Sequence, residues 1–283
     1  MKVSNYLYFF LVIIQISMPV GVYANIANGG FEQSEPNATI DANTPTDWQR
    51  ENYAAVVNNF VPQPDPNRGN ANNWKIDIVE GLDPFEGQSF VVLSTSDILP
   101  EPMYAKISQQ IEVFAGQRLA GMYFFGTCDY IPFEDYAIIT LIPNPNSSLR
   151  DIMLLNINVA DVGSYSSMDG WGFFEYTFSQ QEAGVYELAL SVSDLSDIIF
   201  KSYLAVDNIT LCYAPEYGDI NYDCQVNMLD FAFMSNDWLN DCSDPIYFSD
   251  PNSLCKFGTD IDGDGPVDVN DLLLMSQNWL TGE

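Results

Sequence analysis

The chain has 283 residues, with 39 Asp and Glu against 9 Lys and Arg and no His, so its formal net charge is −30. Without histidine, a Ser-His-Asp triad and an HExxH zinc site are both excluded, because each needs an imidazole. So negative a surface repels nucleic acid and anionic membranes, and we expect neither as a partner. Hydrophobic residues make up 47% of the chain and aromatic residues 14%, which favours a packed core over disorder.

Residues 1–24 have the pattern of a secretion signal. Lys2 provides a basic start, residues 7–14 are continuously apolar, and Val22 and Ala24 are the small residues that signal peptidase requires. The apolar run is too short to cross a bilayer. We therefore expect a secreted or cell-surface protein with no membrane span after processing.

Residues 25–213 predict one β-sandwich domain. Short β-rich runs recur between turn signals, and residues 185–190 alternate in hydrophobicity with the period of a strand. No long amphipathic helix separates the runs, which favours an antiparallel sandwich over an α/β fold. The eight expected strands span 90–93, 105–113, 119–125, 136–142, 152–159, 171–178, 185–192 and 203–211.

Both ends of this region resemble jelly-roll carbohydrate-binding modules. The resemblance is carried by the NGGFE motif at 28–32, by Trp48, which we expect to pack beneath the first strand, and by AVDNITL at 205–211. It implies a jelly roll in which a Ca²⁺ ion joins the first and last strands, with Glu32 and Asp207 in the ligand positions. A solvated Glu32 and a turn-forming Asp207 are the alternative, which the sequence leaves open.

Sugar binding requires flat aromatic faces beside polar groups. Trp74 lies in the polar segment 70–75, and we expect it to be exposed. The segment 129–136 gathers three carboxylates and three aromatic residues around one proline. It is either a ligand rim, a Ca²⁺ loop, or a turn whose aromatic residues cover the sandwich edge. The ligand-binding candidates are Trp74, Tyr130, Asp135 and Tyr136.

Two 12-residue segments near the carboxyl end, 219–230 and 260–271, have the ligand spacing of calcium loops. Such a loop winds around the ion so that side chains at positions 1, 3, 5, 9 and 12 point inward, while position 7 offers its carbonyl. The expected ligands of loop 1 are Asp219, Asn221, Asp223, Gln225, Asn227 and Asp230. Those of loop 2 are Asp260, Asp262, Asp264, Pro266, Asp268 and Asp271. We expect two Ca²⁺ ions here and a third in the sandwich if Glu32 and Asp207 bind one.

The two loops belong to an internal repeat with an offset of 41 residues. Each loop leads into an expected helix with apolar residues at i, i+3 and i+7, and the two helices can pack their apolar faces together. The valines at position 8 are expected to pair between the loops. The repeat places Phe231, Met234 and Trp238 in the first helix, and Leu272, Met275 and Trp279 in the second.

This repeat resembles the type I dockerin over about residues 218–281, within a C-terminal domain of 214–283. The resemblance implies binding to a cohesin-like domain or another scaffold protein that gathers polysaccharide-degrading proteins. Three features depart from the family. Cys224 stands at loop position 6, which favours glycine. Residues 241–259 are an insertion. Loop positions 10 and 11, where the family carries hydroxyl residues, are Met228-Leu229 and Val269-Asn270.

The chain has five cysteines, so at least one lies outside any intramolecular disulfide. Cys242 and Cys255 flank the insertion and are able to close it, whereas Cys224 is able to compete for either. A bond between Cys128 and Cys212 would join a middle strand to the last one. The sequence does not choose among these pairings.

The fold class expected is therefore an all-β antiparallel jelly-roll sandwich followed by a small helical, EF-hand-like calcium domain. The function we expect is a non-catalytic, calcium-binding, secreted protein with a polysaccharide-binding sandwich, attached to a scaffold through its C-terminal domain. Two alternatives remain open. One is a glycoside hydrolase or lyase on the same jelly roll, using a pair of carboxylates. The other is a surface or adhesion protein without affinity for glycans.

Overall fold

The computed structural model describes residues 26–36, 44–62, 70–95, 103–195, 200–215, 217–248, 250 and 253–281. The expected secretion signal at 1–24 lies outside these residues. In the part of the chain that is described, no helix has the length and apolar character needed to cross a membrane.

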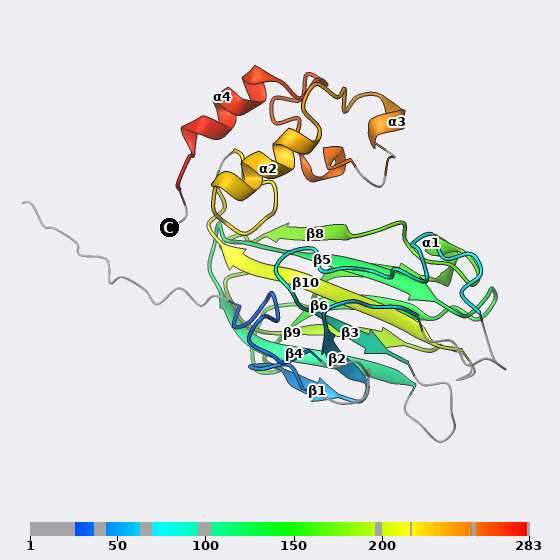
Figure 1. Ribbon diagram of the computed structural model, residues 1–283. Helices are drawn as coiled ribbons and strands as arrows, with labels where there is room; N and C mark the ends of the chain where they lie inside the picture. Colours follow the sequence, from blue (N-terminus) through cyan, green and yellow to red (C-terminus); the bar gives the residue numbers. More distant parts are fainter. Residues whose placement is uncertain are drawn as a thin grey trace, which may run out of the picture.

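Ten strands form two antiparallel sheets of five strands, which face each other as a sandwich (Figure 1). The first sheet has the order β1-β4-β9-β6-β7 and the second β2-β3-β10-β5-β8. The strands of the first sheet are β1 (Gln49–Glu51), β4 (Tyr104–Val113), β9 (Gly184–Ser193), β6 (Tyr136–Pro143) and β7 (Ile152–Asn158). Those of the second are β2 (Ala54–Val57), β3 (Phe90–Ser94), β10 (Ser202–Cys212), β5 (Arg118–Thr127) and β8 (Gly172–Thr177).

All eight strands expected from the sequence are present, and the antiparallel sandwich is confirmed. Two further strands, β1 and β2, were not predicted. They are only three and four residues long. β2 reads AAVV and is buried throughout, so it shows no alternation, and alanine has a low strand propensity. The pairing of β2 with β3, which is a tertiary contact, defines it as a strand.

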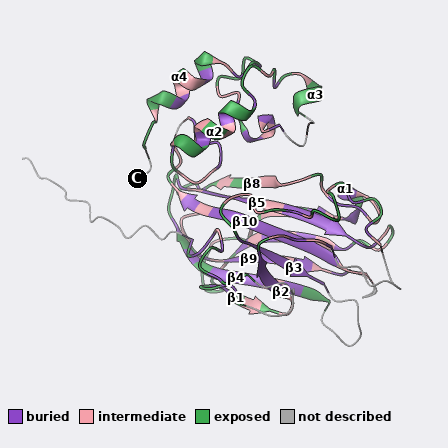
Figure 2. Ribbon diagram, viewed as in Figure 1, coloured by how far each residue is buried: buried purple, intermediate pink, exposed green. Residues whose placement is uncertain are grey.

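The main core lies between the sheets, where buried residues occupy the long strands of both (Figure 2). Trp48 is confirmed as a core residue. Its side chain is 4% exposed, and its ring lies 5.6 Å from that of Phe31. A second apolar cluster lies apart from the main core and combines residues of β2, β3, β5 and β10 with Phe60, Trp74 and Leu82 from the segment between β2 and β3. Strands β2, β3, β5 and β10 of the second sheet are therefore buried on both faces.

The C-terminal region contains two longer helices, α2 (Met228–Asn236) and α4 (Val269–Gln277). Each begins after a capping box, in which the N-cap side chain accepts from the backbone while an Asp three residues later accepts from the N-cap N–H. Between them lie α3 (Pro245–Phe248) and a 3-10 turn (Cys255–Phe257), while α1 (Val159–Val162) belongs to the sandwich. The helical region lies beside β8 and the end of β10 (Figure 1).

The internal repeat is confirmed as a structural repeat, with two corrections. Met234 and Met275 are buried in one cluster, as expected. Trp238 and Trp279 follow the ends of their helices and are 38% and 37% exposed, so they do not form the helix contact. The position 8 valines are both buried, but each pairs with the chain after the other repeat's helix. The N–H of Leu239 donates to Val267 at 2.8 Å, and that of Leu280 donates to Val226 at 2.8 Å.

Candidate calcium loops and their setting

Loop 2 is an open cluster of carboxylates. Oxygens of Asp260, Asp262 and Asp264 all lie within 4.8 Å of one another. Asp262 and Asp264 are exposed, and Asp260 is half-buried. Burial is the largest cause that raises the pKa of Asp260, and the charges of Asp271 and Asp262 raise it further. An oxygen cluster with this mutual repulsion suits a hard divalent cation.

The loop backbone orients these carboxylates. The two oxygens of Asp260 accept from the N–H groups of Gly263 and Gly265, at 2.9 and 3.0 Å. Gly265, at loop position 6, has φ +108°, the left-handed conformation that favours glycine. At position 12, Asp271 accepts from Ile261 at 2.7 Å and from Asp268 at 2.7 Å. The residue expected to close the ion's coordination therefore also caps α4.

Loop 1 repeats the backbone pattern in a different setting. Asp230 accepts from the N–H groups of Ile220 and Asn227, at 2.7 and 2.9 Å, as Asp271 does in loop 2. The side chain of Asp219 is only 2% exposed. Burial raises its pKa to about 6, although the charge of Arg118 acts in the opposite direction. Loop 1 is therefore enclosed where loop 2 is open.

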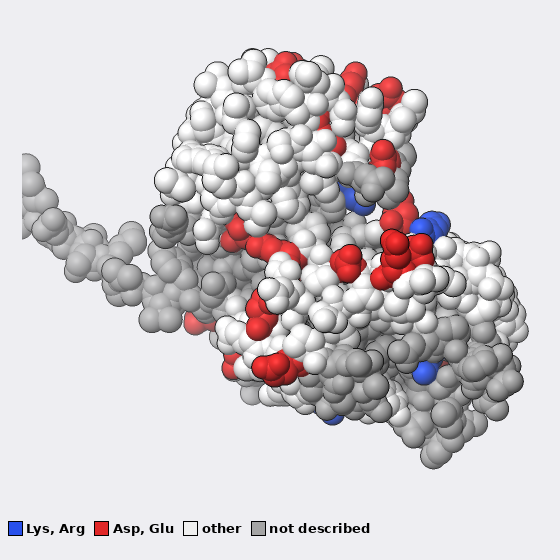
Figure 3. All heavy atoms as spheres, viewed as in Figure 1, with Lys and Arg blue, Asp and Glu red and all other residues white. Residues whose placement is uncertain are grey.

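The enclosing surface is the β-sandwich. Arg118 of β5 forms an ion pair with Asp219, and its guanidinium carbon lies 4.9 Å from the ring centroid of Tyr222. The Tyr222 ring stacks on Phe173 of β8, with centroids 5.3 Å apart. Sequence reasoning missed Arg118, because no local pattern links residue 118 to a loop one hundred residues later. On the face drawn in Figure 3, acidic side chains gather where the two regions meet.

A disulfide between Cys212 and Cys224 joins the end of β10 to loop 1. Cys224, at loop position 6, has φ +74°, which confirms that this position requires the left-handed conformation. The alternative pairing of Cys128 with Cys212 is thereby wrong. Cys128 is fully buried in the sandwich and lies outside both disulfides.

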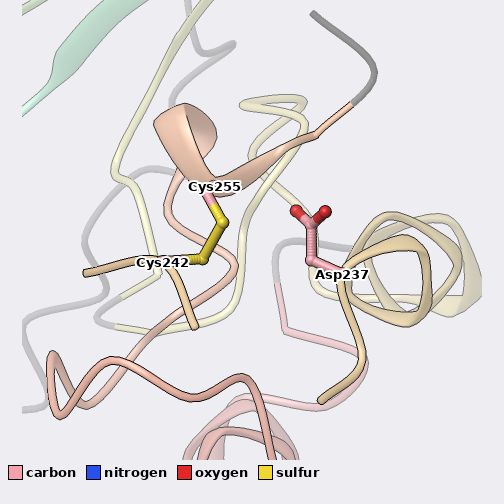
Figure 4. Close-up of side chains that lie close together, drawn as sticks. All are labelled: Asp237, Cys242 and Cys255. Carbon is pink, nitrogen blue, oxygen red and sulfur yellow. A yellow bond between two sulfur atoms is a disulfide. The ribbon is translucent and has the colours of Figure 1, made fainter. Parts of the chain in front are cut away.

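The second disulfide, Cys242–Cys255, closes the insertion, as one of the open alternatives proposed. Asp237 lies close to it (Figure 4). These three side chains do not suit a metal, because both sulfurs are bonded to each other. The Asp237 carboxylate instead accepts from the N–H of Leu254 at 2.7 Å and from the hydroxyl of Thr259 at 3.1 Å. Its role is to hold the insertion against the end of α2.

In the sandwich, Glu32 and Asp207 are brought to the same loop. Glu32 accepts from the N–H groups of Gln88 and Ser89, at 2.7 and 2.8 Å. Asp207 accepts from Phe85 and Glu86, at 2.9 and 3.2 Å. Asp207 is fully buried, and burial raises its pKa to about 8. The two carboxylates therefore bind the loop before β3 through its backbone.

Trp74 is not the exposed sugar platform that the sequence suggested. It is 8% exposed and packs with Phe124 and Tyr203, at centroid distances of 5.8 and 5.9 Å. Its indole N–H donates to the carbonyl of Thr127 at 2.9 Å. The polar residues beside it in sequence lie at the surface while the ring turns inward.

Asp135 is also buried rather than on a ligand rim. It is fully buried and accepts from the Ser202 hydroxyl at 2.6 Å. Burial, followed by the charge of Asp194, raises its pKa to about 8. A group so placed cannot contact a polysaccharide in this conformation. Tyr136, half-buried, starts β6 in the first sheet, away from Trp74 on the second. The four predicted ligand residues therefore do not form one site.

Tyr130 belongs to an aromatic cluster that the sequence only partly indicated. Its ring lies 5.2 Å from Phe133, 5.4 Å from Tyr165 and 5.9 Å from Phe200. All four residues are half-buried. Tyr165 has φ +55°, and its N–H donates to the carbonyl of Asp129 at 2.7 Å. The cluster joins three segments that are distant in sequence.

Comparison with known protein families identifies the C-terminal region. Residues 217–280 match the dockerin type I domain family. No curated protein matches the chain. Among solved structures, the chain is similar to TmCBM61 in complex with β-1,4-galactotriose, at 14% identity and a TM-score of 0.37, over 65% of this chain and 94% of that one.

The chain is also similar to the C-terminal family 22 carbohydrate-binding module of Clostridium thermocellum Xyn10B, at 9% identity and a TM-score of 0.34, over 68% of this chain and 96% of that one. The chain is similar as well to the K2 cleaved adhesin domain of Lys-gingipain, at 12% identity and a TM-score of 0.38, over 66% of this chain and 97% of that one. The chain thus carries a dockerin type I domain at residues 217–280, preceded by an antiparallel β-sandwich.

Proposed function

We propose that the protein is a secreted, non-catalytic, calcium-binding module that binds a polysaccharide through its sandwich and a scaffold protein through its C-terminal domain. The observation that carries the proposal is the dockerin type I match at residues 217–280, over a repeat whose second loop brings three carboxylates together. The NGGFE and AVDNITL motifs at the two ends of the sandwich support the glycan part.

The donor sets of the two loops fit Ca²⁺. Loop 2 offers five carboxylates among its six ligand positions, with the carbonyl of Pro266 at position 7. Loop 1 offers three carboxylates, with oxygens from Asn221, Gln225 and Asn227. A bound Ca²⁺ supplies the positive charge that allows these groups to stay together. We propose one ion in each loop, and a third between Glu32 and Asp207.

Calcium binding is tested by calorimetric titration of the full chain after treatment with chelator. We expect uptake by the wild type, and loss of one site in Asp264→Asn. Asp151→Asn, at an exposed position directly before β7 of the first sheet, is the matched control. Absence of heat and of any calcium-dependent change in stability would contradict the proposal.

The attachment surface proposed for the scaffold protein lies on the C-terminal domain. Large apolar side chains are unusually exposed there, and an exposed apolar patch on a soluble domain marks an interaction site. They occur at equivalent positions of the two repeats, which are Met228 and Val269, Trp238 and Trp279, and Leu239 and Leu280. We propose a cohesin-like partner that is apolar at its contact, because positions 10 and 11 of the loops lack the hydroxyl residues of the family.

For the sandwich, we propose that the aromatic cluster around Tyr130 contacts the sugar rings, with Tyr136 as a further candidate. The net charge of −30 favours neutral over acidic polysaccharides, since like charges repel. Affinity electrophoresis of the full chain through gels that contain neutral polysaccharides tests this. We expect retardation that Tyr130→Ala reduces and Tyr213→Ala, at an exposed tyrosine after β10, does not. Release of reducing sugar by the wild type would favour the hydrolase or lyase instead.

A further inference from the structure

Loop 1 is built into the sandwich at several points besides the disulfide and the Arg118 ion pair. The side chain of Asn208 donates to the carbonyl of Asn221 at 2.8 Å. The hydroxyl of Thr210 donates to the carbonyl of Tyr222 at 2.7 Å. Asn208 and Thr210 lie at the irregularity of β10 where its pairing with β5 shifts register. The sandwich therefore fixes the backbone of loop positions 3 and 4.

The loop of the sandwich that precedes β3 also contacts the C-terminal domain. Phe85 packs against Phe233 of α2 and Phe257, with centroid distances of 5.6 Å in both cases. The N–H groups of Phe85 and Glu86 donate to the buried carboxylate of Asp207. The backbone that carries Glu86 is thus fixed from the sandwich, and the neighbouring side chain is fixed from the C-terminal domain.

Glu86 lies near loop 1, because its N–H donates to Asp207 and the next residue of β10, Asn208, donates to the loop carbonyl of Asn221. Its Oε2 atom is buried and has no hydrogen-bond partner. Burial raises the pKa of Glu86 to about 7, and the carboxylates that raise it further are, in order, those of Asp223, Asp230, Glu32 and Asp219. Three of these four belong to loop 1. A buried carboxylate oxygen without a donor, in the neighbourhood of other carboxylates, is suited to a cation.

The composition of loop 1 shows why an extra ligand is needed. It has three carboxylates where loop 2 has five, and one of the three, Asp219, is already paired with Arg118. The side-chain amide of Asn221 donates to the carboxylate of Asp223 at 3.0 Å. One oxygen of this second carboxylate is therefore already engaged. Since Ca²⁺ takes six to eight oxygens, loop 1 by itself is the poorer site.

We propose that Glu86 is a ligand that the sandwich supplies to the calcium ion of loop 1, which makes this loop an interdomain calcium site. The inference rests on the calcium binding proposed above. It assigns the two loops different roles. Calcium in loop 2 stabilises the C-terminal domain alone, whereas calcium in loop 1 also fastens that domain to the sandwich.

The test compares calcium titrations of the full chain in the wild type and in Glu86→Gln. Asp223→Asn identifies loop 1, Asp264→Asn identifies loop 2, and Glu112→Gln, an exposed carboxylate on β4, is the matched control. We expect Glu86→Gln to weaken one site about tenfold, in the range seen when a group that supports a metal is removed. The weakened site should be the one that Asp223→Asn loses and Asp264→Asn keeps.

Thermal unfolding distinguishes a Glu86 side chain that binds calcium from one that only adds negative charge near the site. Without calcium, Glu86→Gln should raise the melting temperature, because it removes a like charge from the cluster. With saturating calcium, it should lower the melting temperature relative to the wild type. If Glu86 does not bind the ion, Glu86→Gln shifts the melting temperature in the same direction with and without calcium. That result overturns the assignment.

The calorimetric outcomes also distinguish the two proposals. A wild type that binds calcium in both loops, together with an unaltered Glu86→Gln, overturns the role of Glu86 only. A wild type that takes up no calcium overturns the calcium proposal itself, and the present one with it.

Discussion

Replacing Arg118 with methionine tests whether the sandwich and the C-terminal domain form one stable unit. Methionine keeps most of the apolar stem but removes the guanidinium. The change leaves the Asp219 carboxylate, 2% exposed, without the partner that lies beside it, and it also removes the contact with the Tyr222 ring. Both losses occur at the junction rather than inside either domain.

The expected size follows from burial. Because the side chains of Arg118 and Asp219 are 13% and 2% exposed, water does little to replace the lost partner. Breaking a buried ion pair costs about 3 kcal/mol, and the cation–π contact adds about 1 kcal/mol. For a chain of this size, a total loss of about 4 kcal/mol lowers the melting temperature by roughly 8–16 °C. Calcium should reduce the loss, because a bound ion would offset the Asp219 charge.

The measurement is thermal and urea unfolding of the full chain in the presence of chelator, monitored by circular dichroism. Arg150→Met, at an exposed position, is the control and should change stability by less than about 0.5 kcal/mol. A double-mutant cycle with Asp219→Asn should give a coupling free energy of about 2 kcal/mol. Equal stability of the Arg118 and Arg150 variants, or a coupling near zero, would refute the reasoning.

Two further predictions concern buried residues of the sandwich. Since burial and then Asp194 raise the pKa of Asp135 from 3.8 to about 8, the folded protein keeps a proton that the unfolded chain releases. Its contribution to stability is therefore full below about pH 4 and is lost as pH rises through about 8. Urea unfolding across this range should show a flatter pH dependence for Asp135→Asn, but not for the exposed Asp151→Asn, and equal slopes would contradict this. Trp74→Ala should lower the free energy of unfolding by about 3–5 kcal/mol, whereas Trp279→Ala should cost about 1 kcal/mol or less. The reverse order would show that Trp74 is not a core residue.

Strand positions and the two candidate calcium loops could be predicted because their signals are local. Alternation over six to ten residues places a strand, and it placed eight of the ten. The two missed strands are short, and β2 lacks a polar face. The candidate calcium loops were picked out from a 12-residue ligand spacing that occurs twice, and the family match covers both segments.

The ligand residues of the sandwich were harder to predict, because exposure is not a local property. Trp74 is surrounded in sequence by polar residues, yet Phe124 and Tyr203, from β5 and β10, enclose its ring. Asp135 follows an exposed glutamate but is fully buried beneath Ser202. In both cases the side chain's surroundings come from strands that pairing brings together.

By itself, the sequence determined the order of the elements, the antiparallel sandwich and the two loops, because hydrophobic period and ligand spacing act over a dozen residues or fewer. Only the tertiary structure decided that loop 1 is enclosed and loop 2 is open. The groups that enclose loop 1, Arg118, Phe173 and Cys212, come from separate strands of the sandwich. Long-range contacts of this kind follow from packing, in which charge and shape are matched between surfaces that no local pattern describes.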